Sequence, residues 1–465
     1  MDRAANHPCV YSHALPFEEN LPHACPSRRQ TRMNPTPSPI TKTHWKRGFW
    51  SLMGTQFQGA FSDNLLKQLV IFIVMAQQWP KEKLDRLVSD AGMYFAVPFL
   101  LFSMFGGWMA DRFSKGRVMM WVKVLEIAIM TFALVALAMQ DLNLQLVSIC
   151  LMGAQSALFA ASKYGSLPEL VPDEKLSWAN GIIEMLTFLA AILGTLAAGL
   201  MANAFPGSSP WPGIILLVLS IAGWWASTGI TRVRPASPDK PLRLNFLGEL
   251  WREFRWMKGD RDLWRANLGN TGFFFIAVLV QMNLLLYAQQ ILKVDPLENS
   301  VLQVALAIGM AVGSMLAGKL SGDHIEYGLI PVGAFLMATM GLVMGMEGVS
   351  KTIFTVCLSL LGIGGGFFIV PIAAVLQHQP PADRKGAVQG AASWLSWVGI
   401  SIAAVLQGEL SLRLHWTPGQ IFWFCAACAA CTGVYVTLTR PAALPALLKR
   451  WTTRRNAECR MPNVE

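Results

Sequence analysis

The chain has 465 residues, of which 53% are hydrophobic and only 14% are charged. A soluble domain carries about 25% charged residues, so this composition excludes an ordinary soluble protein and is typical of a chain that crosses a membrane several times. The formal net charge of +10 does not indicate a nucleic-acid partner, because the basic residues gather in the loops on one side of the predicted helices.

The N-terminal segment, residues 1–43, is polar and rich in proline and contains no continuous apolar core. It is therefore not a secretory signal peptide, and its composition predicts disorder. Met33 offers a second start, so residues 1–32 are candidates for absence from the native chain. The basic segment 441–465 is expected to form a second tail at the C-terminus.

Roughly twelve apolar stretches of about 20 residues follow, between Trp50 and Thr439. A stretch of that length crosses the hydrocarbon core as one helix, so the sequence predicts an all-α membrane protein with twelve transmembrane helices. Basic residues mark cytoplasmic loops. They place both termini in the cytoplasm, because the loops on the opposite side carry only Lys81, Lys83, Arg86, Lys293, Lys351 and Arg413.

Three polar residues, Asp63, Asn64 and Lys67, interrupt the first of these helices. Ionisable groups at membrane depth are costly and by default mark a transport pathway, so we expect these residues to line a central cavity and bind substrate. Asp63 and Lys67 are four residues apart and share a helix face, which lets them neutralise one another. The alternative is a self-satisfied pair with a purely structural role.

The loop between the second and third helices reads GGWMADRFSKGR, from Gly106 to Arg117. Glycines let helices approach closely, and the carboxylate in this loop can accept hydrogen bonds or pair with a base across it. The basic residues hold the loop in the cytoplasm. We expect a conformational latch made by Gly107, Asp111, Arg112, Lys115 and Arg117, with Asp323 from the repeat described next.

A degenerate second copy of this loop indicates an internal repeat. The loop residues Gly106, Asp111 and Gly116 recur 212 positions later as Gly318, Asp323 and Gly328. Pro172 and Gly181, which follow the fourth helix, recur 209 positions later as Pro381 and Gly390. Two such echoes predict pseudo-symmetric six-helix halves with the substrate site between them. We expect the halves at 44–233 and 263–440. A cytoplasmic linker at 234–262 joins them and contains an amphipathic helix that lies on the inner membrane surface.

Polar residues also interrupt later helices. Asn180 and Glu184 lie one turn apart in the fifth helix, and Lys163 precedes Tyr164 at the inner end of the fourth. Glu184 either lines the cavity or is satisfied locally. Lys163 either binds an anionic head group or extends to the membrane interface. We treat these three residues as candidate substrate contacts.

Patterns typical of enzymes are weak. The pattern from His378 to Asp383 is found in acyltransferases, but here it contains two prolines and lies in a short loop between predicted helices. Three cysteines at three-residue spacing have no His or acid near them, which favours packing over metal binding. We therefore expect no catalytic site, metal or cofactor.

Several strings resemble the bacterial lysophospholipid transporters, a family of the major facilitator superfamily. The glycine-rich loop and its second copy resemble the signature of the superfamily as a whole. The more specific strings are FSDNLLK at 61–67, KGRVMM at 115–120, KYG at 163–165, ANG at 179–181 with Glu184, and GGFFIVP at 365–371 with Leu376 and Gln377. The resemblance covers the chain from about Gly48 to Thr439.

This resemblance implies a transporter that flips lysophospholipids, chiefly lysophosphatidylethanolamine, from the outer to the inner leaflet of the bacterial inner membrane by alternating access. An acyltransferase/acyl-carrier-protein synthetase would then reacylate them. The family's acid in the first helix corresponds to Asp63, and its inner-side lysine corresponds to Lys163. Gln281 occupies the position in the seventh helix where a basic residue is expected.

Other functions remain as alternatives to this one. A multidrug or small-molecule exporter of the same superfamily also pairs a few buried acids with apolar walls. A membrane-embedded acyltransferase would require His378, which transport does not. A sensor or scaffold that transports nothing is disfavoured by the charged residues retained in the first helix.

Overall fold

The computed structural model describes residues 45–76, 81–205, 209–243, 245–294, 296–322, 324–447 and 449. Within these ranges the chain is almost entirely helical. The tail expected at 1–43, most of the tail expected at 441–465, and Asp323 lie outside the described residues.

The long helices correspond to the predicted apolar stretches, because a buried backbone in lipid must satisfy its own hydrogen bonds. Among the described residues, ten helices are long and apolar enough to cross a membrane, and α10 is a shorter apolar helix. The prediction of an all-α membrane protein is confirmed. The ten lie in α2 (Lys81–Arg112), α3 (Lys115–Ala138), α4 (Leu142–Leu170), α5 (Leu176–Ala204), α6 (Trp211–Thr228), α8 (Arg261–Gln290), α9 (Pro296–Ser321), α11 (Lys351–His378), α12 (Lys385–Gly408) and α13 (Pro418–Thr439). The shorter helix is α10 (Leu329–Met344), and α1 (Trp45–Ala76), which contains the charged Asp63 and Lys67, is long but is not among the ten.

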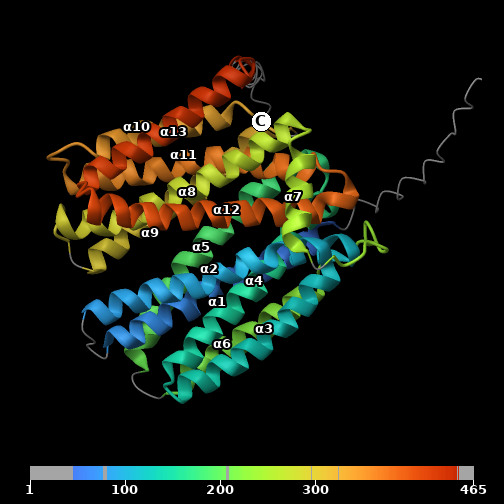
Figure 1. The fold of residues 1–465 in the computed structure, drawn as a ribbon, viewed down its shortest axis with the longest axis horizontal. Helices are drawn as coiled ribbons and strands as arrows, with labels where there is room; N and C mark the ends of the chain where they lie inside the picture. Colours follow the sequence, from blue (N-terminus) through green and yellow to red (C-terminus); the bar gives the residue numbers. More distant parts are fainter. Residues whose placement is uncertain are drawn as a thin grey trace, which may run out of the picture. The chain divides into compact units, whose positions relative to one another are not determined.

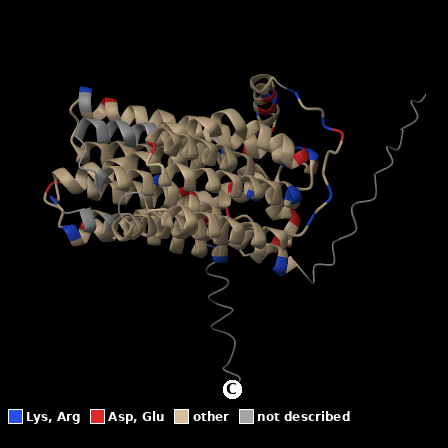
Figure 2. Cartoon of the chain, turned by 90° about the horizontal axis from the view of Figure 1, so that it is seen from below, with Lys and Arg blue, Asp and Glu red and all other residues tan. Residues whose placement is uncertain are grey.

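The buried apolar residues form separate cores before and after α7 (Phe246–Met257) in the sequence. This helix lies in the expected linker. One large cluster joins α8 to α13, whereas two clusters lie within α1 to α6. We call these two groups of helices the N-terminal half and the C-terminal half (Figure 1). Large apolar side chains such as Leu101, Trp225 and Leu438 are exposed, and charged residues gather toward the helix ends (Figure 2), as expected for a surface in contact with lipid.

Two pairs of helices make the most extensive contacts between the halves, α2 with α12 and α5 with α9. Both contacts depend on glycine. A Cβ atom at Gly107 would lie 2.6 Å from the carbonyl oxygen of Gly386, and a Cβ atom at Gly318 would lie 3.0 Å from the carbonyl oxygen of Ser177. Small residues therefore bring the backbones of the two halves together.

Helix α7 is amphipathic, as the sequence predicts. Asn245 caps it by accepting a hydrogen bond from the Gly248 N–H at 2.8 Å. Its buried side chains are Leu250, Glu253 and Met257, and the two apolar ones belong to the core of the C-terminal half. Trp251 is exposed on another face.

Candidate functional site

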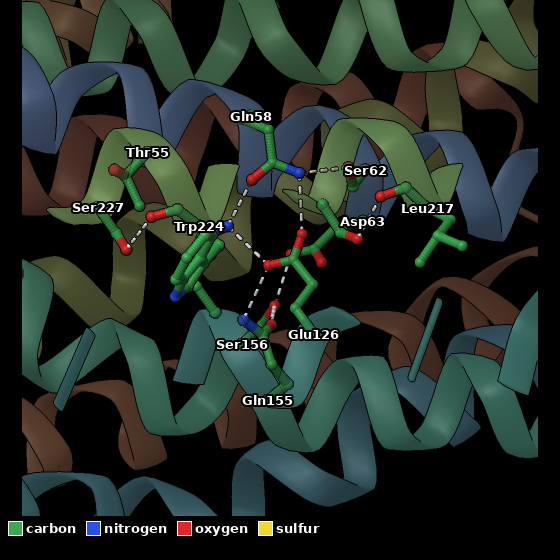
Figure 3. Close-up of polar contacts among 12 residues, drawn as sticks. Thr55, Gln58, Ser62, Asp63, Glu126, Gln155, Ser156, Leu217, Trp224 and Ser227 are labelled. Carbon is green, nitrogen blue, oxygen red and sulfur yellow. Dashed lines mark hydrogen bonds and ion pairs between the residues drawn. The ribbon is translucent and has the colours of Figure 1, made fainter. Parts of the chain in front are cut away.

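A layer of polar side chains divides the core of the N-terminal half. One apolar cluster holds residues such as Leu65 and Met130, and the other holds residues such as Phe49 and Val122. Between them lie polar residues of α1, α3 and α4 that point toward one another (Figure 3). We call this group the polar layer, and it consists of Gln58, Ser62, Asp63, Lys123, Glu126, Gln155 and Ser156.

A buried ion pair lies at the centre of the polar layer. The Lys123 ammonium is 2.6 Å from Glu126 Oε2, and the side chains are only 1% and 0% exposed. Lys123 also donates to Gln58 Oε1 at 2.7 Å. Gln58 and Gln155 donate to the Glu126 carboxylate at 2.9 and 3.1 Å. A buried ion pair is tolerated only when further hydrogen bonds satisfy it, and these two amides supply them.

Asp63 joins the polar layer through Ser156. The Ser156 hydroxyl lies 2.7 Å from Asp63 Oδ2 and 3.0 Å from the side-chain oxygen of Gln155. The other carboxylate oxygen, Oδ1, is buried and has no hydrogen-bond partner. A carboxylate with one unsatisfied oxygen is suited to accept a donor from a ligand.

The ion pair that the spacing of Asp63 and Lys67 allows is not among those formed by the described residues. The Lys67 ammonium instead lies 5.4 Å from the centre of the Phe95 ring, a cation–π contact. Asp63 takes its partner from α4. The two groups therefore remain available as separate positive and negative contacts on α1.

Lys163 and Glu184 lie in a second polar group, which Tyr164 connects. The Tyr164 hydroxyl donates to Glu184 Oε1 at 2.9 Å, and the Lys163 ammonium lies 4.1 Å from the centre of the Tyr164 ring. Lys163 and Glu184 are both buried. The structure thus brings together two of the residues that the sequence singled out, from α4 and α5.

Two further candidates lie elsewhere. The Asn64 side chain donates to the Ala60 carbonyl of its own helix at 2.8 Å. Gln281 is exposed on α8 and makes no hydrogen bond to the polar layer within the described residues.

Asn180 connects the two halves instead of standing alone in α5. It donates to Gln377 Oε1 at 3.0 Å, and Gln377 donates back to Asn180 Oδ1 at 2.6 Å. Both side chains are buried. This reciprocal amide pair joins the start of α5 to the end of α11.

Asp111 makes a second polar contact between the halves. Its carboxylate accepts the backbone N–H groups of Gly386 at 2.6 Å and Ala387 at 3.0 Å, at the start of α12. A helix N-terminus presents free N–H groups and favours negative charge. We call the end of the bundle where α2 ends and α12 begins the latch end.

A linker residue, Lys240, completes the surroundings of Asp111. Its ammonium is 2.7 Å from Asp111 Oδ2, and its carbonyl accepts a hydrogen bond from Arg112 at 2.7 Å. Lys115 pairs with Glu169 at 2.5 Å, whereas Arg117 is exposed. Asp111 and Gly107 are therefore the expected latch residues for which the described part of the chain shows contacts with the other half.

The linker also contacts the C-terminal half. Glu253 of α7 lies 3.4 Å from the Arg384 guanidinium, just before α12. Burial raises the pKa of Glu253 above its ordinary value, and the nearby Arg384 charge opposes this effect.

Sequence reasoning missed most of the polar layer. Lys123 and Glu126 are charged residues three apart in an apolar stretch, which is the same signal that marked Asp63. The neutral members Gln58, Gln155 and Ser156 give no such signal, because isolated amides and hydroxyls are common in helices.

Comparison with known proteins shows the family and the fold of the chain. The pattern of the Major Facilitator Superfamily matches residues 60–404. A lysophospholipid transporter of Salmonella enteritidis PT4 is 31% identical over 349 residues, which cover 72% of this chain and 80% of that one. Among solved structures, the human organic anion transporter MFSD10 has a TM-score of 0.72 at 14% identity, over 84% of this chain and 99% of that one. The transporter FucP in its outward conformation has a TM-score of 0.66 at 13% identity, over 83% and 98%.

The apolar helices and the fold neighbours define the fold of a multi-pass membrane protein, and the superfamily match with the 31% identical relative defines a transporter rather than an enzyme. The sequence matches are more specific than the fold. The chain belongs to the lysophospholipid transporter family of the major facilitator superfamily. The family resemblance found in the sequence motifs is therefore confirmed.

Proposed function

We propose that the protein flips lysophospholipids, chiefly lysophosphatidylethanolamine, from the outer to the inner leaflet of a bacterial inner membrane. Transport is by alternating access of the two halves. The termini lie in the cytoplasm, where an acyltransferase/acyl-carrier-protein synthetase reacylates the product. The curated relative in Salmonella enteritidis supports the substrate class by its name.

The observation that carries this proposal is the incomplete pairing of Asp63 and Lys67. Asp63 Oδ1 is buried without a partner, and the Lys67 ammonium contacts an aromatic ring rather than a carboxylate. A phosphoethanolamine head group carries one positive and one negative charge. We assign its ammonium to Asp63 and its phosphate to Lys67, with Lys163 as a second phosphate contact nearer the latch end.

The C-terminal half supplies a surface suited to the acyl chain. Within the described helices α8 to α13, the buried polar side chains are amides and hydroxyls, such as Asn267, Asn283 and Ser314. The rest of the core is apolar, and a buried carboxylate, Glu326, lies in the loop before α10. An amphiphile with a small head fits between a polar half and an apolar half. A sugar would require polar groups from both.

The contacts at the latch end fit the outward-open state of such a cycle. The hydrogen bonds that the described residues form between the halves include those of Asp111 with α12 and of Asn180 with Gln377. Because Gly107 and Asp111 hold α2 against α12, we propose that they latch this end closed while substrate enters from the other. Arg112, Lys115 and Arg117 shape the loop that carries Asp111, and Asp323 is proposed as the counterpart in the repeat.

The test is uptake of labelled lysophosphatidylethanolamine into spheroplasts. It compares the native chain, Asp63→Asn, empty vector and Asp239→Asn, a matched control in the exposed part of the linker. A hydrogen bond to a charged group contributes about 1.5–3 kcal/mol, so Asp63→Asn should lower uptake about tenfold or more. Asp239→Asn should transport like the native chain.

Uptake no higher than vector, from a protein shown to be in the membrane, would contradict the proposal. Efflux of ethidium in the same cells would then assign the chain to drug export. If Asp63→Asn takes up the lipid as well as the native chain does, the proposed substrate stands, but Asp63 is not part of the site that binds it.

A further inference from the structure

A cavity of about 340 Å³ lies within the C-terminal half, among α8, α11 and α13. None of the residues of the polar layer lines it. Its walls are mainly apolar and include Leu268, Gly272, Ile372, Val375 and Val436. Asp63, Lys67 and Lys163 do not line it either, so the cavity is separate from the proposed head-group contacts.

The cavity is elongated along the helices and opens toward lipid. Its lining runs along α8 from Asp262 to Gly272, which at 1.5 Å per residue is about 15 Å, or half the thickness of the hydrocarbon core. Leu268 and Tyr435 line it and are 45% and 49% exposed. An acyl chain of the surrounding membrane could enter it sideways without crossing polar surface.

The end of the cavity nearest the latch end carries an excess of positive charge. Asp262 forms an ion pair with Arg440 and lies 3.7 Å from Arg265, so two guanidinium groups share one carboxylate. The Arg440 guanidinium also lies 3.9 Å from the centre of the Tyr327 ring. All four residues line the cavity. Guanidinium groups match the geometry of phosphate oxygens and bind them through two hydrogen bonds.

We propose that this cavity binds one anionic phospholipid from the leaflet at the latch end. The phosphate lies at Arg265 and Arg440, and one acyl chain lies between α8, α11 and α13. The charged mouth and the apolar interior are both needed to explain the cavity, because a soluble anion would leave its apolar walls unused and an uncharged lipid would leave the second arginine without a counter-charge. The site does not depend on what the protein transports.

Gly272 allows the interior of the cavity to be tested. No atom lies within 4 Å of a Cβ atom built there, so a side chain at this position can start without a clash, and Gly272→Leu should extend into the cavity. Gly92 in α2 has equally open surroundings and lies outside the cavity, which makes Gly92→Leu the matched control. For the mouth, Arg265→Gln is compared with Arg261→Gln, an exposed arginine of the same helix turn that does not line the cavity.

The experiment measures binding of dioleoylphosphatidylglycerol to the purified full chain by native mass spectrometry, which resolves the first bound lipid. Each methylene group kept out of an apolar site weakens binding about fourfold, so Gly272→Leu should lower the affinity for the first lipid at least about tenfold. Arg265→Gln should lower it about fivefold. The controls Gly92→Leu and Arg261→Gln should bind like the native chain.

An unchanged affinity in Gly272→Leu would overturn the proposal. If that variant does not fold, Cys431→Phe, which also narrows the cavity, takes its place with the same expected loss. A separate arm uses inorganic phosphate alone. Phosphate that raises the thermal midpoint of the chain as much as the lipid does would identify a simple anion site and would also overturn the proposal.

Discussion

The two halves of the bundle have helices of similar length but differ in what they bury. The core of the C-terminal half is one continuous apolar cluster, in which aromatic rings such as Tyr287 and Phe354 stack with centres 4.4 Å apart. The polar layer splits the core of the N-terminal half, and its ion pair is almost completely buried. Burying charge requires compensating contacts that apolar packing does not. The difference shows that the N-terminal half holds its core together partly through buried charge, whereas the core of the C-terminal half is held together mainly by apolar packing.

The largest expected effect comes from breaking the buried pair on one side only. Lys123→Met leaves the Glu126 carboxylate buried without its cation and should lower the free energy of unfolding by about 3–5 kcal/mol. The double variant Lys123→Met/Glu126→Gln removes both charges but keeps an oxygen that can accept from Gln58 and Gln155, so it should lose clearly less than the single variant, about 1–2 kcal/mol. Chemical unfolding in detergent micelles measures both.

Leu284→Met is the control for this experiment, because it is a volume-conserving change at a completely buried site of the C-terminal half. Equal losses in the single and double variants would show that the two charges do not depend on one another, and the contrast between the halves would then not rest on this pair.

A smaller effect is expected from removing single amides in each half. Gln155 donates to the Glu126 carboxylate, so Gln155→Leu should cost about 2–3 kcal/mol. Asn283 donates to the neutral carbonyl of Pro418 at 2.8 Å, and its own side-chain oxygen is unsatisfied, so Asn283→Leu should cost about 1 kcal/mol or less. Thermal unfolding of the two variants side by side checks the ranking, and the reverse order would contradict it.

The smallest difference between the halves is expected from removing one neutral side-chain hydrogen bond in each, because both losses should be equal. Gln56 donates to Thr187 at 2.9 Å in the N-terminal half, and Asn270 donates to Ser396 at 2.7 Å in the C-terminal half. Both are neutral hydrogen bonds, so Thr187→Val and Ser396→Ala should each cost about 1 kcal/mol. A clear difference between their unfolding free energies would show that the halves differ in more than buried charge.

The sequence predicts the fold better than the site. Apolar stretches long enough to cross the membrane have few alternatives to helix. The repeated glycines indicated an internal repeat, but of Gly106 and its counterpart Gly318 only Gly318 lies against the other half, where a Cβ atom would be 3.0 Å from the Ser177 carbonyl oxygen. Asp63 could be recognised because a charge in an apolar stretch is rare.

The partners of the site residues could not be predicted in the same way. Spacing alone allowed Asp63 to pair with Lys67, but packing of α1 against α4 supplied Ser156 instead. The contacts of Asn180 with Gln377, and of Asp111 with Lys240, join residues more than a hundred positions apart. Only the three-dimensional arrangement of the helices brings such residues together.

The position of Lys240 has a consequence for the kinetics of any movement at the latch end. The Asp111 carboxylate binds two N–H groups of α12 and the ammonium of Lys240, which belongs to the linker. Arg112, the neighbour of Asp111, donates a hydrogen bond to the Lys240 carbonyl and so keeps Lys240 beside Asp111. When α2 and α12 separate, the carboxylate loses two amide donors and keeps its cation. The activation barrier therefore contains the loss of two hydrogen bonds and not the exposure of an isolated charge at the membrane boundary.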